Sequence, residues 1–258
     1  MKVVSLSPSL TEIIMTLGAS SLLSGVTEHC PEIEGSARLG SPKALRLAEI
    51  EALRPDGILV DLNENRPEEI RMLQKNFKLL NFDVRGPKDA ADAVCALGRF
   101  IGCVSEASKL AGDIRQAITA SAAGITEGHD SVRTLILIWN QPLLTVNFDT
   151  YMSRLVECAG GRNVFRADPL REFAVELEDM IEKEPEVLFL AGPPYPFAAR
   201  HVKKFREYRN FSKIPIRVVD GLLFSRFGPR TIEALETLKD YLDQAREARL
   251  QAGDRRES

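Results

Sequence analysis

The segment from Pro87 to about Ala123 carries no strand signal, and it separates two regions in which strands and helices alternate. Apolar residues recur across it at helical spacing, from Val94 and Leu97 to Ile114. This pattern predicts one helix of about 35 residues, much longer than the ~11–12 residues of an average helix. A long helix in the middle of 258 residues leaves room for a separate α/β lobe on each side.

Strands and helices alternate in both flanking regions, which favours parallel sheets. Before the helix, strands are expected at residues 1–6, 22–27, 57–61 and 78–84. After a polar break at residues 124–133, strands are expected at 134–139, 187–191 and 214–219. The predicted organisation is an N-terminal α/β lobe (1–86), a connecting long helix (87–123) and a C-terminal α/β lobe (124–258).

Composition excludes some classes of protein. The net charge of −3 gives no basic footprint for nucleic acid, and no apolar run approaches the ~20 residues of a membrane span. Pro8 and Glu12 interrupt the apolar core that a signal peptide requires, so we expect the mature fold to begin at residue 1. The expected location is therefore cytoplasmic, or periplasmic or cell-surface if an export signal has been removed.

Common enzyme signatures are missing from the sequence. It contains no G-x-G-x-x-G, no G-x-x-x-x-G-K-[ST], no G-x-S-x-G and no H-E-x-x-H, and its three histidines, His29, His129 and His201, lie far apart. We therefore expect a protein that is not an enzyme. A small α/β hydrolase or a chelate-processing activity stays as a rival.

The loop after the first strand has two interpretations. Ser9-Leu10-Thr11-Glu12 fits S-x-x-E, the capping box, with Pro8 fixing the start of the helix. In the first interpretation Ser9 caps the helix and nothing more. In the second, Ser7, Pro8 and free backbone N–H groups of this turn face a ligand, because ligands of open α/β sheets bind beyond the carboxyl ends of the strands.

Two further loops of the N-terminal region carry candidate ligand-binding residues. His29 follows the second strand, where it is either a polar loop residue or a group that ligates or hydrogen-bonds a cofactor. Arg66 follows the strand at 57–61, where it lies in a solvated connection or binds an anionic ligand.

The C-terminal region offers an aromatic wall. Trp139, the only Trp of the chain, lies at a strand end, and Asn140, Phe148 and Tyr151 follow within 12 residues. A flat, partly apolar ligand suits such a wall, and core packing at a strand end is the alternative.

Two later loops complete the candidate set. Tyr195 lies in the proline-rich loop 192–197, which is stiff and carries exposed aromatic residues. Arg226 lies among apolar residues and is either a surface charge or a clamp for a ligand carboxylate or phosphate.

Several stretches, in order along residues 2–242, carry a resemblance to a known family. VVSLSPSLTEII resembles the family's opening I-V-S-L-x-P-x-x-T-E-I, and LAEIEALRPDGILV resembles its L-E-x-I-x-A-L-x-P-D-L-V. TVNFDTYMSRLVECAGGRNVF resembles the segment that ends in G-G-x-N-V-F, and PYPF and VDGLLFSRFGPR resemble the subgroup labelled cobalamin-binding. The family is the helical-backbone metal-receptor group of substrate-binding proteins, which serve ABC importers of cobalamin, haem and ferric siderophores.

The resemblance implies two Rossmann-like lobes joined by one long α-helix, with a ligand cleft between the lobes. It implies a bound corrinoid, haem or ferric siderophore without a covalent cofactor, an ABC permease as partner, and a monomer. Trp139, Phe148 and Tyr151 would then pack on the ligand. Polar contacts would come from the residues Ser7, His29, Arg66 and Arg226, with a metal bond as a further role for His29.

The sequence departs from the family at two points. Gly40-Ser41-Pro42-Lys43 occupies the stretch where the best-known cobalamin binder of this fold packs a Trp on the corrin. Relatives meet their permease through one exposed acid on each lobe, and here Ala48 and Asn210 lie near those points, with Glu49, Glu51 and Glu207 close by. A cytoplasmic sensor or store for a metal chelate or bare metal, without a transporter, is the alternative.

Overall fold

The computed structural model describes residues 1–123 and 131–257. The polar break predicted at 124–133, including His129, therefore lies mostly outside the described residues. The chain divides into two compact units. Unit 1 comprises Met1–Val84, Lys88–Arg115 and Arg226–Pro229, and unit 2 comprises Arg85–Pro87, Gln116–Ser225 and Arg230–Ser258.

Unit 1 is built on a parallel sheet of five strands in the order β3-β2-β1-β6-β7. The strands are β1 (Val3–Ser5), β2 (Leu23–Val26), β3 (Ala37–Arg38), β6 (Gly57–Asp61) and β7 (Leu79–Phe82). A short antiparallel ribbon, β4 (Gly40–Ser41) with β5 (Ala44–Leu45), follows β3. The four strands predicted for this region are present, and β6 has the predicted bounds.

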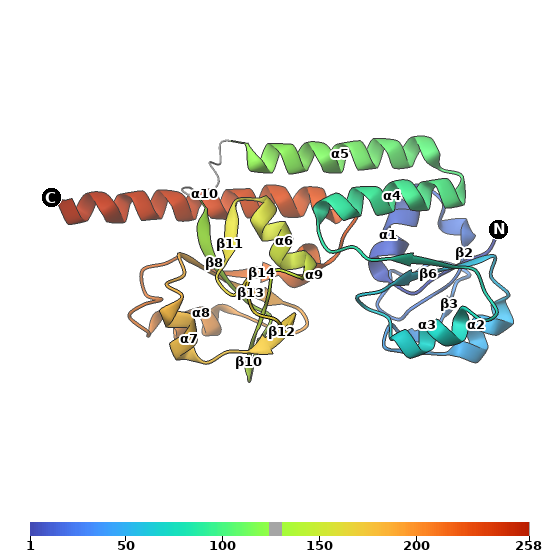
Figure 1. The fold of residues 1–258 in the computed structure, drawn as a ribbon, viewed down its shortest axis with the longest axis horizontal. Helices are drawn as coiled ribbons and strands as arrows, with labels where there is room; N and C mark the ends of the chain where they lie inside the picture. Colours follow the sequence, from blue (N-terminus) through green and yellow to red (C-terminus); the bar gives the residue numbers. More distant parts are fainter. Residues whose placement is uncertain (124–130, 258) are drawn as a thin grey trace. The chain divides into compact units, whose positions relative to one another are not determined.

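Helices cover both faces of the unit 1 sheet (Figure 1). Alternate residues of the strands, such as Val4 and Ile58, point to a core that includes Ile50 of α2 (Leu47–Leu53) and Ile70 of α3 (Pro67–Leu73). The opposite face carries α1 (Pro8–Thr16) and α4 (Pro87–Ile101). Burial on both faces explains why every residue of β6 is buried.

The segment predicted as one helix of about 35 residues is two helices, α4 and α5 (Val104–Ala122), which lie antiparallel side by side (Figure 1). Gly102 has a φ of +82°, a left-handed conformation that ends α4 and lets the chain reverse. Arg115 of α5 donates to Asp92 of α4 at 2.9 Å, a contact that joins the two helices. Helical periodicity is the same in one helix or in a hairpin, so the sequence pattern could not reveal the reversal. The long connecting helix is present as α5, which begins in unit 1 and continues into unit 2 after Arg115.

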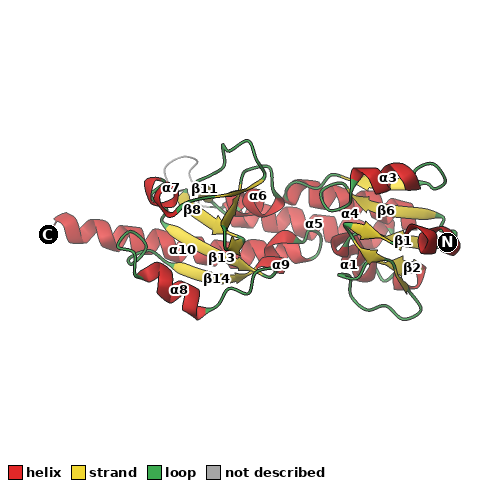
Figure 2. Ribbon diagram, turned by 90° about the horizontal axis from the view of Figure 1, so that it is seen from below, coloured by secondary structure: helices red, strands yellow, loops and turns green. Residues whose placement is uncertain are grey.

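Unit 2 contains a second parallel sheet, in the order β11-β8-β13-β14 (Figure 2). Its strands are β8 (Val132–Leu137), β11 (Gly161–Asn163), β13 (Val187–Gly192) and β14 (Ile216–Asp220). An antiparallel sheet of β9 (Trp139–Asn140), β10 (Leu143–Val146) and β12 (Glu172–Ala174) adjoins it. Strands β10, β11 and β12 were not predicted, because two of them have only three residues and β10 follows Pro142 directly.

The helices of unit 2 also cover both faces of its sheet. Leu188 and Leu190 pack in a core with Met180 of α7 (Leu177–Glu182) and Phe205 of α8 (Ala199–Arg206). The remaining helices are α6 (Tyr151–Cys158), α9 (Gly221–Ser225) and α10 (Arg230–Glu257). Phe189 of β13 contacts the rings of Phe224 on α9 and Tyr241 on α10. The predicted fold class, two Rossmann-like α/β lobes with a long connecting helix, is confirmed.

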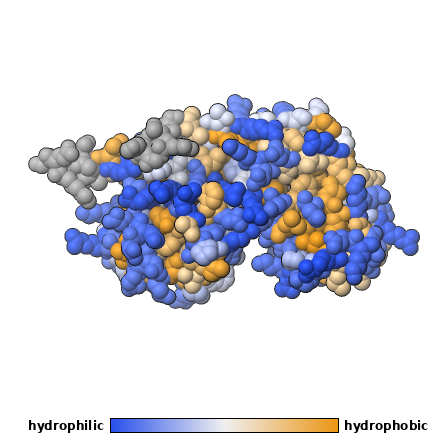
Figure 3. Space-filling view, in the orientation of Figure 1, coloured by the Kyte–Doolittle hydropathy of each residue, from blue (hydrophilic) through white to orange (hydrophobic). Residues whose placement is uncertain are grey.

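The surface shown in Figure 3 is largely hydrophilic over unit 2, while apolar side chains gather on part of unit 1. Among the described residues, no helix has the length and apolar character needed to cross a membrane.

Glycine substitutions test the α4/α5 hairpin. A Cβ on Gly98 would lie 2.1 Å from the Cβ of Ala107, whereas a Cβ on Gly112 would meet no atom within 4 Å. We expect Gly98→Ala to lower the free energy of unfolding by about 2 kcal/mol through overpacking. Gly112→Ala, the matched control, should raise it by up to about 1 kcal/mol, since Ala is the better helix former. Urea unfolding monitored by circular dichroism measures both, and equal stabilisation by the two variants would contradict the hairpin.

Candidate functional site

Parallel pairing collects the candidate loops of unit 1 at one edge of its sheet. The loops that contain Ser7, His29 and Arg66 follow the carboxyl ends of β1, β2 and β6. In open α/β sheets this edge is where ligands bind. His29 and Arg66 are exposed there, while Ser7 and Pro8 are buried.

The predicted capping box at Ser9 and Glu12 is wrong. Helix α1 begins at Pro8, so Ser7 occupies the N-cap position, and its side chain makes no cap hydrogen bond. Proline is favoured in the first helical turn because it has no N–H to satisfy, and this starts the helix before Ser9. Ser9 and Glu12 bind a distant segment instead: Ser9 Oγ accepts from Phe227 N at 3.3 Å, and Glu12 accepts from Arg226.

Arg226 fastens the segment 226–229 to the rest of unit 1. Its Nη1 lies 2.6 Å from Glu12 Oε1, and its Nη2 donates to the carbonyl of His29 at 3.2 Å. The side chains of Arg226 and Glu12 are only 14% and 10% exposed, so solvent screens this pair weakly. The structure therefore gives Arg226 internal partners, and the sequence did not indicate them because they lie 214 and 197 positions away.

The buried carboxyl group of Asp61 and that of half-buried Glu64 share one hydroxyl donor beneath the same edge. Ser7 Oγ donates to Asp61 Oδ2 at 3.4 Å and also faces the carboxyl group of Glu64. Burial raises the pKa of Asp61 to about 6, against the opposing effect of the Asn63 N–H and Ser7. Burial, and then the charge of Asp61, raise the pKa of Glu64 to about 7, although Ser7, Arg226 and Lys43 oppose the shift. Because Ser7 has one proton to donate, the pair is best satisfied when one carboxyl is protonated.

Asparagine side chains hold this loop in place. Asn65 Oδ1 accepts from Asp61 N, and Asn65 Nδ2 donates to the carbonyls of Leu6 and Pro42. Asn63 N donates to Asp61 Oδ1 at 2.9 Å, and Asn63 Nδ2 donates to Asp83. The sequence pattern indicated only a polar connection at these residues. The Asp-x-Asn-x-Asn spacing was the signal available, since Asp and Asn side chains bond backbone groups two residues on.

Three candidate residues of unit 2, Trp139, Asn140 and Tyr195, lie beyond the carboxyl ends of β8 and β13. Trp139 is 37% exposed, and its ring lies 5.4 Å from that of Tyr195 in an edge-to-face arrangement. Asn140 Nδ2 donates to Tyr195 Oη at 3.0 Å, and His201, which was not a predicted site residue, contacts the same oxygen. The structure therefore brings Trp139, Asn140 and Tyr195 together.

Two predicted members of the aromatic wall have other surroundings. Tyr151 is 8% exposed and its hydroxyl lies 2.7 Å from Thr231 Oγ1, so we assign it to the packing of α6 on α10 rather than to a ligand surface. Phe148 is half-buried, and the guanidinium carbons of Arg154 and Arg166 lie 4.8 and 4.9 Å from its ring centroid. These cations already cover the ring, which leaves Trp139 as the exposed aromatic face.

His29 was also predicted as a metal ligand. Within the described part of the chain, no group of three or more His, Cys, Asp and Glu side chains is arranged to hold a metal ion. A bond from His29 to the metal of a chelate needs no second protein ligand, and it stays a prediction.

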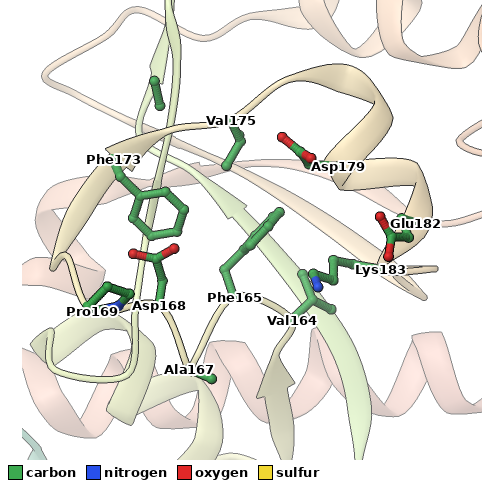
Figure 4. Close-up of a pocket in the computed structure, with 11 residues that line it drawn as sticks. Val164, Phe165, Ala167, Asp168, Pro169, Phe173, Val175, Asp179, Glu182 and Lys183 are labelled. Atoms are coloured by element: carbon green, nitrogen blue, oxygen red, sulfur yellow. The ribbon is translucent and has the colours of Figure 1, made fainter.

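A cavity of about 460 Å³ lies elsewhere in unit 2, between α7, β12 and the turn after β11 (Figure 4). The rings of Phe165 and Phe173 meet there edge to face at 5.7 Å, and Asp168 and Lys183 line it. It contains none of the predicted site residues.

Residues 3–215 match the family described as "Periplasmic binding protein". The chain belongs to this family. It is 26% identical over 243 residues to the vitamin B12-binding protein of Pectobacterium carotovorum subsp. carotovorum, covering 92% of this chain and 86% of that protein.

Solved structures of other periplasmic binding proteins share the fold. The periplasmic vitamin B12-binding protein BtuF of Vibrio cholerae superposes with a TM-score of 0.81 at 23% identity, over 95% of this chain and 97% of that one. The periplasmic haem-binding protein RhuT of Roseiflexus sp. RS-1, in its apo form, gives a TM-score of 0.79 at 21% identity, over 95% and 98%. The resemblance inferred from the sequence motifs is confirmed.

The acid pair predicts how stability depends on pH. The pKa values of Asp61 and Glu64 in the folded protein, about 6 and about 7, lie above their ordinary values of 3.8 and 4.5. Folding therefore opposes their ionisation, and their contribution to stability is complete below about pH 4 and is lost as the pH rises through 6 to 7. We expect Asp61→Asn to gain stability relative to the native protein between pH 5 and pH 8, by an amount on the order of 2 kcal/mol.

Urea unfolding at pH 5, 6, 7 and 8 measures this effect. Glu64→Gln should behave like Asp61→Asn. Glu68→Gln is the control, because the Glu68 side chain is 69% exposed, and it should keep the native pH dependence. If the free energy of unfolding depends on pH in the same way for Asp61→Asn and the native protein, Asp61 ionises in the fold with an ordinary pKa.

Proposed function

We propose that this protein is a non-catalytic substrate-binding protein that captures a metal chelate, a corrinoid, haem or ferric siderophore, for an ABC importer. Its membership of the periplasmic binding protein family supports a binding role. The relatives named above, which bind vitamin B12 and haem, support the class of ligand.

The exposed indole of Trp139 is the observation that carries the proposal. A large aromatic side chain at the carboxyl edge of a parallel sheet, 37% exposed, leaves apolar area in water that a flat ligand would cover. The ring of Tyr195 contacts the indole edge to face. Trp139 Nε1 donates to the carbonyl of Gln141 at 3.1 Å. The indole is thus held in one orientation before the ligand arrives, which lowers the entropic cost of binding.

Unit 1 carries polar side chains of its own that suit a metal chelate. His29 and Arg66 are exposed at the carboxyl edge of its sheet, where an imidazole can bond the metal and a guanidinium can bond an anionic substituent.

The importer is the proposed partner, and the protein would act as a monomer outside the cytoplasmic membrane. Docking through acids, as the family resemblance implies, has candidates in Glu49 and Glu51 of unit 1 and Glu207 of unit 2. All three are exposed, although Glu49 lies 3.6 Å from Arg46.

Calorimetric titration with cyanocobalamin, haemin and a ferric siderophore tests the proposal. At least one of them should bind with a Kd well below about 100 µM, which corresponds to ~5.5 kcal/mol. Trp139→Ala should weaken that binding by about 30-fold, or ~2 kcal/mol, as expected for an aromatic anchor.

Leu170→Ala provides the control, because Leu170 is 60% exposed, belongs to the same unit and lies outside the proposed ligand set. It should leave the Kd unchanged. Failure of the native protein to bind any of the three chelates would refute the proposed function. Equal losses of affinity in Trp139→Ala and Leu170→Ala would refute the role of Trp139.

A further inference from the structure

The proton positions around Tyr195 follow from its neighbours. Ala198 N donates to His201 Nδ1 at 2.9 Å. A backbone N–H can only donate, so Nδ1 must be the ring nitrogen without a hydrogen. The imidazole of His201, which is 6% exposed, therefore carries its hydrogen on Nε2.

The hydroxyl oxygen of Tyr195 accepts two hydrogen bonds. His201 Nε2 lies 3.2 Å from Tyr195 Oη, and because Nε2 holds the ring hydrogen, it is the donor. Asn140 Nδ2 donates to the same oxygen at 3.0 Å. The proton of the hydroxyl must then be offered to a different acceptor. The described part of the chain supplies no acceptor for it.

This hydroxyl lies beside the exposed aromatic face. Tyr195 belongs to the loop after β13, and Asn140 ends β9, which follows β8 after one residue. Both therefore stand at the carboxyl edge of the unit 2 sheet. Tyr195 is half-buried, and its ring centroid is 5.4 Å from that of Trp139. A ligand stacked on the indole would thus have an oriented O–H donor at its rim.

We propose that Tyr195 is a specificity-determining donor that bonds a carbonyl or carboxylate oxygen at the periphery of the bound chelate, with His201 and Asn140 as positioning residues. This inference rests on the proposed function and narrows it. The site selects flat chelates that carry peripheral amide or carboxylate groups, and it discriminates against chelates with an apolar rim, which would leave the O–H unpaired.

The tautomer of His201 can be read without any ligand. A long-range ¹H–¹⁵N correlation spectrum of the full chain at pH 8 should show the His201 ring protonated at Nε2 and not at Nδ1. The other tautomer would overturn the network, because Nε2 would then take the tyrosine proton.

Binding measurements test the donor itself. We expect Tyr195→Phe, which keeps the ring beside Trp139, to weaken by about 10-fold the binding of whichever probe the native protein takes, cyanocobalamin with its amides or haemin with its carboxylates. Tyr208→Phe removes a hydroxyl from the same unit outside these loops and should leave the Kd unchanged. Equal affinities of native protein and Tyr195→Phe would overturn the proposal.

A mutant cycle tests the positioning role of His201. His201→Phe should lower affinity in the native background but cause no further loss in Tyr195→Phe, since the interaction it supports is already gone. His201→Gln, which can still donate toward Tyr195, should recover part of the affinity. Additive losses from His201→Phe and Tyr195→Phe would show that His201 acts only through folding.

A small probe separates the two proposals. If the native protein binds none of the chelates, the proposed function fails. The hydrogen-bond donor role of the Tyr195 hydroxyl is then tested with nicotinamide, a flat ring with an amide carbonyl. Nicotinamide at millimolar concentration should shift the indole NMR signal of Trp139 more strongly than pyridine does, and Tyr195→Phe should remove the difference. Equal effects of the two probes on the native protein would overturn the donor role.

Discussion

Parallel strand pairing is the constraint on which the rest of this structure depends. In unit 1 the pairing of β1 with β2 and β6 forces three loops far apart in the sequence to one edge of the sheet. In unit 2 the pairing of β8 with β13 does the same for Trp139 and Tyr195. The positions of the side chains that can touch a ligand thus depend on the hydrogen-bond ladders of two buried sheets.

Polar groups near these edges mostly bond one another. Arg226 is held by Glu12 and by the carbonyl of His29, and Asn65 joins three stretches of backbone. Such contacts preorganise the loops and leave few groups for a ligand. The groups that stay available at the two edges include the face of Trp139, the proton of Tyr195 and the exposed side chains of His29 and Arg66.

Local signals in the sequence were sufficient for the longer parallel strands and for the family, but not for the short strands such as β11 and β12. The apolar run of β6, ended by Asp61 and begun after Pro55, was predicted with its observed bounds. Long-range partners were not predictable in this way. Glu12 fits a local capping pattern, yet its partner lies 214 residues away. Likewise, the left-handed Gly102 turns a continuous helical pattern into a hairpin, because periodicity records which face is buried and not where the helix reverses.

Since Trp139 is the only Trp of the chain, its fluorescence reports directly on the proposed ligand surface. Corrinoids and haem absorb in the range of indole emission, so a chelate packed on this ring should quench it. Titration of the full chain with cyanocobalamin and haemin should give saturable quenching of Trp139, with the same Kd as calorimetry. Calorimetric binding without quenching would contradict a ligand surface at Trp139.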